Sequence, residues 1–139
     1  MLYFAYGSNL SHKQMLARCP KAKFFKVATL ANYSRQFDGH SERWGGAVAN
    51  IIPTKNSSVT GALFEIDDEH LKSLDGYEGY GIRYDRQVCT VTVGDGTTRE
   101  AHVYLRLVPH PIGKPTLDYM RTIEEGLSDC GIEYVEELT

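Results

Sequence analysis

The sequence has few cysteines, and they follow none of the patterns that bind zinc or build a disulfide framework. Cys19, Cys89 and Cys130 are odd in number, widely spaced and not arranged as C-x-x-C. We therefore expect three reduced thiols, most of them buried. A chain of 139 residues buries about two thirds of its unfolded surface, so it can fold without a disulfide or a metal.

Long apolar runs and an excess of basic charge are missing too. The apolar run at residues 2–6 is too short for a signal peptide or a membrane span, and no basic segment precedes it. The 15 Lys and Arg residues are outnumbered by 18 Asp and Glu residues, which gives a formal net charge of -3, whereas nucleic-acid-binding domains are usually basic. We expect a cytoplasmic protein without a nucleic-acid or membrane partner. Without repeats or linkers, residues 1–139 are expected to form a single domain.

Short runs of β-branched and aromatic residues, separated by turn signals, predict a strand-rich chain. They lie at residues 2–6, 23–31, 34–38, 47–52, 59–66, 84–93 and 100–108. Residues 54–58 are interpreted as a turn, and Asp95-Gly96 predicts a hairpin between the last two strands. The last run alternates, with Ala101, Val103, Leu105 and Leu107 on one face and His102, Tyr104 and Arg106 on the other. This period of two predicts a strand with one buried face.

Three helices, and a short fourth one near the end of the chain, are predicted by capping residues and helical spacing. The first begins at Ser11, whose spacing to Gln14 fits a capping box, and the second begins at Asp67 and ends at Gly76. The third covers residues 116–128, and Gly131 separates it from a short last helix through Val135. Six or seven strands with helices between and after them predict an α+β fold, a small, mostly antiparallel β-barrel with flanking α-helices.

The turn between the first strand and the first helix is the first candidate site. Tyr6, Gly7, Ser8 and Asn9 follow the apolar run. Gly7 can adopt a positive φ and lets a ligand approach the main chain. Because a helix N-terminus offers unsatisfied N–H donors, this turn can bind a carboxylate or phosphate without any lysine.

Glu78 is the second candidate. It directly follows the predicted end of the second helix, where the macrodipole disfavours negative charge, and it lies between Tyr77 and Tyr80 in a glycine-rich loop. Both effects are expected to raise its pKa from about 4.3 toward neutrality, as suits a residue that accepts and returns a proton.

Together these residues resemble the gamma-glutamylcyclotransferase family. The similarity extends from Leu2 to about Leu138 and comprises residues 2–10, 20–25 and 44–49, Gly61, residues 74–79, and Pro115-Thr116 followed by Tyr119. It implies a small barrel, often paired as a homodimer, that releases 5-oxoproline from small gamma-glutamyl compounds without metal or cofactor. The connections at residues 37–44 and 79–84 are short relative to some relatives, and such loops shape the pocket for the leaving group.

The resemblance also implies a set of site residues. Glu78 corresponds to the proton-transferring residue, the main chain of residues 3–8 to the part that holds the gamma-glutamyl group, and Tyr119 to a tyrosine that closes the pocket. The predicted substrate-binding residues are Tyr3, Phe4, Ala5, Tyr6, Gly7, Ser8, Asn9, Tyr84, Tyr104 and Tyr119; Tyr84 and Tyr104 are equally typical of core tyrosines. The histidines lack metal-ligand spacing, and Ser8 is not framed as a nucleophile.

Three functions remain open at this point. The first is a cyclotransferase acting on gamma-glutamyl amino acids, on gamma-glutamyl amines or on a gamma-glutamyl group carried by a larger molecule. The second is a hydrolase, which would release free glutamate. The third is a non-catalytic module that keeps the carboxylate pocket, with Glu78 only satisfying buried donors.

Overall fold

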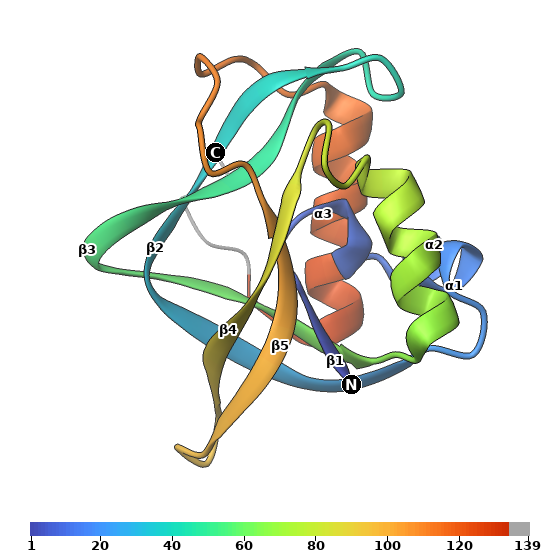
Figure 1. Cartoon of the computed structure of the whole chain (residues 1–139), viewed down its shortest axis with the longest axis vertical. Helices are drawn as coiled ribbons and strands as arrows, with labels where there is room; N and C mark the ends of the chain where they lie inside the picture. The colour runs from blue at the N-terminus through green and yellow to red at the C-terminus, as the bar shows by residue number, and fades with distance from the viewer. Residues whose placement is uncertain (134–139) are drawn as a thin grey trace.

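The strands of the protein close into a barrel. A computed structural model describes residues 1–133, and its strands follow the order β1–β3–β2–β4–β5 around the barrel (Figure 1). They span β1 (Leu2–Ala5), β2 (Lys23–Ser41), β3 (Gly46–Glu65), β4 (Asp85–Val93) and β5 (Thr98–Leu105). β1 and β5 pair in parallel through Tyr3 and His102, and the other neighbours pair antiparallel. The predicted α+β barrel is confirmed.

The described residues contain five strands rather than the predicted six or seven, because two strands are long and bent. β2 includes both residues 23–31 and 34–38, and β3 includes both 47–52 and 59–66. Asn32 and Asn56 adopt positive φ angles of 65° and 66° and face each other, with the Asn56 N–H donating to Asn32 Oδ1. The asparagines bend the two strands together without ending either, so the turn predicted at residues 54–58 is wrong.

Three α-helices and a short 3₁₀ helix pack beside the barrel: η1 (Ser8–Leu10), α1 (His12–Arg18), α2 (Asp68–Glu78) and α3 (Leu117–Cys130). Ser11 caps α1 as predicted by accepting from the Gln14 N–H. α2 runs through Gly76 and ends two residues later, because Gly79 adopts the left-handed conformation with φ 66°. The short helix predicted through Val135 extends outside the described residues. No helix within residues 1–133 is long and apolar enough to cross a membrane.

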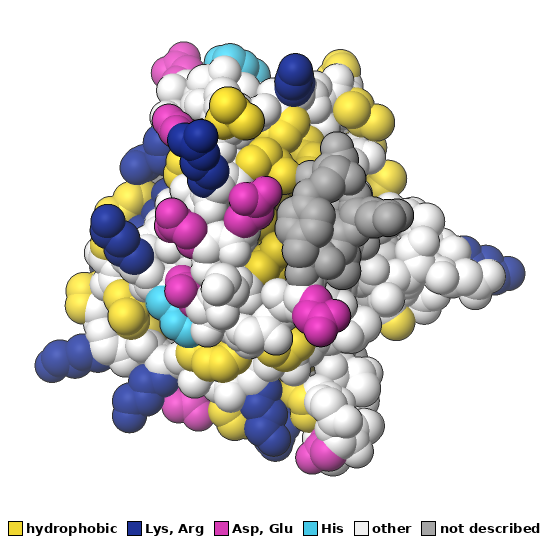
Figure 2. Space-filling model, turned by 180° about the vertical axis from the view of Figure 1, so that it is seen from behind, with side chains coloured by type: hydrophobic (Ala, Val, Ile, Leu, Met, Phe, Trp, Pro, Cys, Tyr) yellow, Lys and Arg dark blue, Asp and Glu magenta, His cyan; other side chains and the backbone are white. Residues whose placement is uncertain are grey.

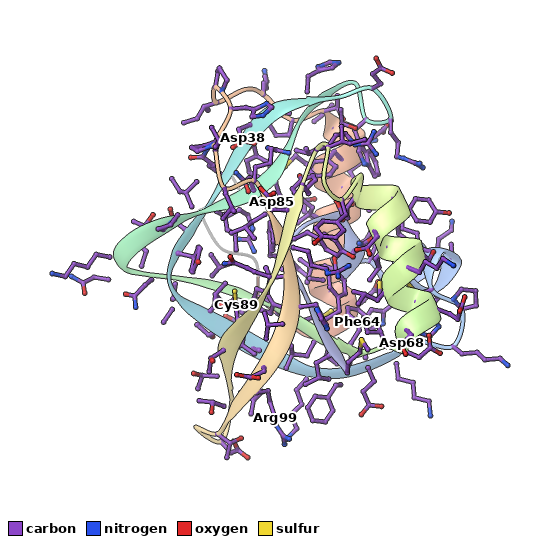
Figure 3. The ribbon with its side chains drawn as sticks, in the orientation of Figure 1. Asp38, Phe64, Asp68, Asp85, Cys89 and Arg99 are labelled. Carbon is purple, nitrogen blue, oxygen red and sulfur yellow. The ribbon has the colours of Figure 1, made fainter. Side chains whose placement is uncertain are left out.

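β5 departs from the predicted single buried face. Ala101, Val103 and Leu105 lie in the core as expected, but Tyr104 and Arg106 are also buried and Leu107 is 60% exposed. α2 covers the other face, since the Tyr104 hydroxyl donates to Asp75, and the strand has ended before Leu107. Figure 3 shows Phe64 on the side of the barrel that faces the helices, where its ring packs against His12 of α1, and Asp68 at the start of α2.

The three cysteines are free, with Cys19 and Cys130 buried and Cys89 half-buried.

The surface carries charges of both signs. On the face shown in Figure 2, Lys and Arg side chains are interspersed with Asp and Glu rather than gathered in one basic region.

α3 and η1 pack together through a glycine. A Cβ atom at Gly126 would lie 2.3 Å from the carbonyl carbon of Leu10 and 2.4 Å from the nitrogen of Ser11. Only a residue without a side chain therefore lets α3 press against η1, and this contact holds the turn after β1 against the barrel.

We expect Gly126→Ala to lower the free energy of unfolding by about 1–3 kcal/mol, because the new methyl group must displace main-chain atoms. Gly76→Ala is the matched control, since Gly76 is also helical and a Cβ there meets nothing within 4 Å. That control should stabilise the protein by up to about 1 kcal/mol. Urea unfolding of both variants measures the difference, and equal midpoints would contradict this account of the contact.

Candidate active site

A cavity of about 680 Å³ opens between the barrel and its helices. Its walls include the turn after β1, the end of α2 and the loop that follows, the connection between β2 and β3, and α3. Most of the predicted site residues line it: Tyr3, Tyr6, Gly7, Ser8, Asn9, Glu78, Tyr84, Tyr104 and Tyr119. Phe4 and Ala5 do not, because their side chains are fully buried in the core. The structure therefore brings Glu78 and the β1–η1 turn to one cavity.

The β1–η1 turn presents unpaired main-chain donors. The N–H groups of Gly7, Ser8 and Asn9 donate no hydrogen bond to any acceptor within residues 1–133. Gly7 has φ -121°, not the positive φ expected, and is required for another reason. A Cβ atom at Gly7 would lie 3.2 Å from the Tyr119 hydroxyl and 3.3 Å from Ala49 Cβ. The missing side chain thus lets α3 and β3 close around the turn.

Polar side chains hold this turn rigidly. Gln14 Nε2 donates to Ser8 Oγ at 2.6 Å and to Asn9 Oδ1 at 3.0 Å, in place of the second half of the predicted capping box. Arg18 also donates to Asn9 Oδ1, and Asn9 Nδ2 donates to the Tyr3 hydroxyl. Because these side chains bind one another, the main-chain N–H groups are what the turn offers to a ligand.

Glu78 is the last residue of α2, and its half-buried side chain lines the cavity. Burial raises the pKa of its carboxyl group to about 7, while the positive charges of Arg18 and Arg83 partly oppose the rise. The predicted direction is right, but the cause is removal from water, whereas the prediction invoked the macrodipole of the helix and the flanking tyrosines. The Glu78 charge in turn contributes, after burial, to the raised pKa of Tyr3, Tyr6, Tyr84 and Tyr119.

The end of α2 is fixed to the barrel one helical turn before Glu78. Asp75 forms an ion pair with Arg86 of β4 and accepts a hydrogen bond of 2.6 Å from the Tyr104 hydroxyl of β5. Tyr104 thus lines the cavity with its ring while its hydroxyl holds α2. Its contact with Asp75 sets where Glu78 lies, because residues three apart share one face of a helix.

Two other tyrosines hold the opposite wall. The Tyr119 hydroxyl accepts from the Ala49 N–H at 2.8 Å, and the Tyr84 hydroxyl donates to the Ala49 carbonyl at 2.8 Å. The Tyr84 hydroxyl proton is therefore already used in a hydrogen bond, whereas the Tyr119 hydroxyl can still donate to a ligand. The ring of Trp44 packs edge-on against Tyr119 with centroids 5.0 Å apart.

The cavity also contains four arginines that the sequence reasoning missed: Arg18, Arg43, Arg83 and Arg106. Arg106 forms a buried ion pair with Asp38, and its Nε atom has no hydrogen-bond partner among the described residues. The alternating pattern of its strand could have indicated Arg106 as a lining residue, because it puts Arg106 on the same face as the predicted site residue Tyr104. Arg43 and Arg83 lie in the connections at residues 37–44 and 79–84, which the resemblance implied as part of the leaving-group pocket, but no sequence pattern pointed to the two arginines themselves.

Comparisons with known proteins indicate the family of the chain. A family model described as gamma-glutamyl cyclotransferase, AIG2-like, matches residues 3–125. Human gamma-glutamylcyclotransferase is 32% identical to the chain over 145 aligned positions, which cover 99% of this chain and 76% of the human protein.

The chain belongs to the gamma-glutamyl cyclotransferase family. The bovine protein of that name is 31% identical over the same shares of both chains. A solved gamma-glutamyl cyclotransferase structure superposes with a TM-score of 0.89 at 29% identity and covers 94% of this chain and 80% of its own. The predicted resemblance and the prediction of an enzyme of this family are confirmed.

The raised pKa of Glu78 gives this family member a pH-dependent stability. Folding lifts that pKa from 4.5 to about 7, so the folded state binds the proton more tightly and loses stability as the pH rises from about 4.5 to about 7. Glu78→Gln removes the titration. Above pH 7.5 we expect the variant to exceed the wild type in unfolding free energy by about 2 kcal/mol, less than the roughly 3 kcal/mol of the full shift because the side chain is only half-buried, and at pH 4.5 to match it. Urea unfolding across this range measures the gap, and a gap independent of pH would contradict the assignment.

Proposed function

We propose that the protein is a cyclotransferase that releases 5-oxoproline from a gamma-glutamyl amino acid or gamma-glutamyl amine. The observation that carries the proposal is the cavity shared by Glu78, with a pKa of about 7, and the unpaired N–H groups of the β1–η1 turn. Membership of the family supports it as well.

The turn binds and bends the substrate. Its N–H groups hold an oxygen of the gamma-glutamyl group, either of the α-carboxylate or of the γ-carbonyl, so that the α-amino nitrogen approaches the γ-carbonyl carbon. Such positioning lowers a barrier by as much as about 7–11 kcal/mol. Donors aimed at the developing oxyanion contribute about 3–4 kcal/mol more. Tyr119 lies against Gly7 and closes this end of the cavity, with its hydroxyl proton available to the same oxygen.

Glu78 carries the protons. The ionised carboxylate takes a proton from the substrate ammonium, and the freed amine attacks the γ-carbonyl carbon. The new C–N bond closes the five-membered ring, and the bond to the leaving nitrogen breaks. Two protons in all pass from the attacking nitrogen to the departing one, which leaves as an ammonium ion. Glu78 alone can carry both protons, because it takes up each one from the attacking nitrogen and then releases it to the departing nitrogen. Its carboxyl group is ionised at the end, as it was at the start.

The chemistry needs no nucleophile from the protein. Ser8 Oγ accepts a hydrogen bond from Gln14 rather than donating to a base, and the attacking group belongs to the substrate itself.

Glu78→Gln tests the assignment. With gamma-glutamyl-alanine as substrate, we expect kcat for 5-oxoproline release to fall by about 10²–10⁴-fold because the amide cannot carry a proton. Calorimetry should still detect substrate binding. Glu69→Gln, the same change at an exposed position in the first turn of α2, should leave kcat unchanged. Mass spectrometry separates the alternatives: free glutamate would indicate a hydrolase, and binding without turnover across several gamma-glutamyl donors would indicate a non-catalytic module.

The pH profile provides a second test. Because the free enzyme must present an ionised Glu78, kcat/KM should fall tenfold per pH unit below a pKa of about 7. Initial rates between pH 5 and 8 measure this. A profile that is flat down to pH 5 would contradict a role for Glu78 as the base.

A further inference from the structure

Three arginines gather around Tyr77, the residue before Glu78. The Arg18 Cζ atom lies 4.5 Å from the centroid of the Tyr77 ring and the Arg43 Cζ atom 5.3 Å from it. Arg83 Nη2 donates to the Tyr77 carbonyl at 3.3 Å. The side of the cavity next to the proposed proton carrier is thus strongly positive.

The guanidinium groups of Arg83 and Arg43 are not engaged by an acid. Both side chains are exposed at the edge of the cavity, and neither forms an ion pair within residues 1–133. The other two arginines of the lining are occupied, since Arg18 donates to Asn9 and Arg106 pairs with Asp38. Glu42, the other acid on the lining, is exposed and pairs with neither.

Gly79 allows Arg83 to lie against the end of α2. A Cβ atom there would be 2.6 Å from Arg83 Nε and 2.8 Å from its Cζ. The guanidinium therefore packs beside the residue that follows Glu78, and its charge acts on the Glu78 carboxyl group. Arg43 also lines the cavity, with its guanidinium over the ring of Tyr77.

This arrangement restricts the leaving group. If Glu78 returns a proton to the departing nitrogen, that nitrogen lies beside the Glu78 carboxyl group. In an amino acid the carboxylate is two covalent bonds from the nitrogen, which brings it within reach of a cation next to Glu78. A guanidinium binds a carboxylate through two parallel N–H donors. The alkyl group of a simple leaving amine has no acceptor atom for these donors.

We propose that Arg83, with Arg43 as a second cation at the edge, binds the carboxylate of the leaving amino acid. The preferred substrates are then gamma-glutamyl amino acids with a free carboxylate rather than gamma-glutamyl amines. This assignment rests on the proposed cyclotransferase function and adds the part of the cavity that selects the leaving group.

Two matched substrates test it. Gamma-glutamyl-alanine and gamma-glutamyl-ethylamine differ only by the carboxylate of the leaving group. We expect the wild type to favour the first by about tenfold or more in kcat/KM. Arg83→Met should abolish most of that preference, mainly through a higher KM for gamma-glutamyl-alanine. The loss of its charge also raises the pKa of Glu78 further, which lowers kcat/KM for both substrates by the same factor and leaves their ratio unaffected. Arg43→Met should act in the same direction by about threefold, and Arg83→Lys should retain part of the preference.

Arg99→Met is the control. Arg99 is exposed near the tip of the β4–β5 hairpin, away from Asp38 and outside the cavity lining (Figure 3). It should change neither substrate. Because both substrates are measured in each variant, a folding defect lowers both rates and does not mimic the predicted loss of preference.

Binding separates this inference from the proposed function. Calorimetry in the Glu78→Gln background, with and without Arg83→Met, measures the preference for the carboxylate without turnover. A preference lost with Arg83 supports the assignment even if the wild type releases no 5-oxoproline, a result that would overturn the cyclotransferase alone. Normal 5-oxoproline release with equal effects of Arg83→Met on both substrates, or none on either, would overturn the assignment alone.

Discussion

The removal of the Glu78 carboxyl group from water, in the same cavity as a turn with unpaired N–H groups, is the constraint on which the account depends. In water this carboxyl would be ionised at neutral pH and would hold a proton too weakly to transfer it. Burial at the end of α2 brings its pKa to about 7. The turn supplies the complementary feature, because its free N–H groups can bind an anionic or carbonyl oxygen.

The barrel and the helices keep these two features in place by different contacts. Tyr104 and Arg86, from adjacent strands, hold Asp75 and with it the end of α2. On the other side, Gly126 lets α3 press on η1, and Tyr119 packs against Gly7. Residues far apart in the sequence thus position the acid and the donors separately. Rigid support of this kind is what proton transfer and substrate bending both require.

The local part of this structure could be predicted from the sequence. The Ser11 and Asp67 caps, the β4–β5 hairpin and the β1–η1 turn depend on neighbouring residues, so their signals are visible in the chain. The bends at Asn32 and Asn56 could not be predicted, because an asparagine at positive φ is typical of turns that end strands. Burial of Tyr104 and Arg106 arises from the covering by α2 and from the pair with Asp38, which periodicity does not reveal. Glu78 was indicated by its place after a helix end and by the family resemblance, whereas the arginines of the connecting segments became evident only from their positions around Tyr77.

The pKa of Glu78 itself is the most direct test of the account. Labelling the glutamate side chains with ¹³C allows each carboxyl carbon to be followed by NMR from pH 3 to pH 9, and the signal missing in Glu78→Gln identifies the residue. The account predicts a midpoint near 7 for that signal. A midpoint close to the ordinary glutamate value of about 4.3 would contradict it, because a carboxyl that is fully ionised at neutral pH is not a group that burial has prepared for proton transfer.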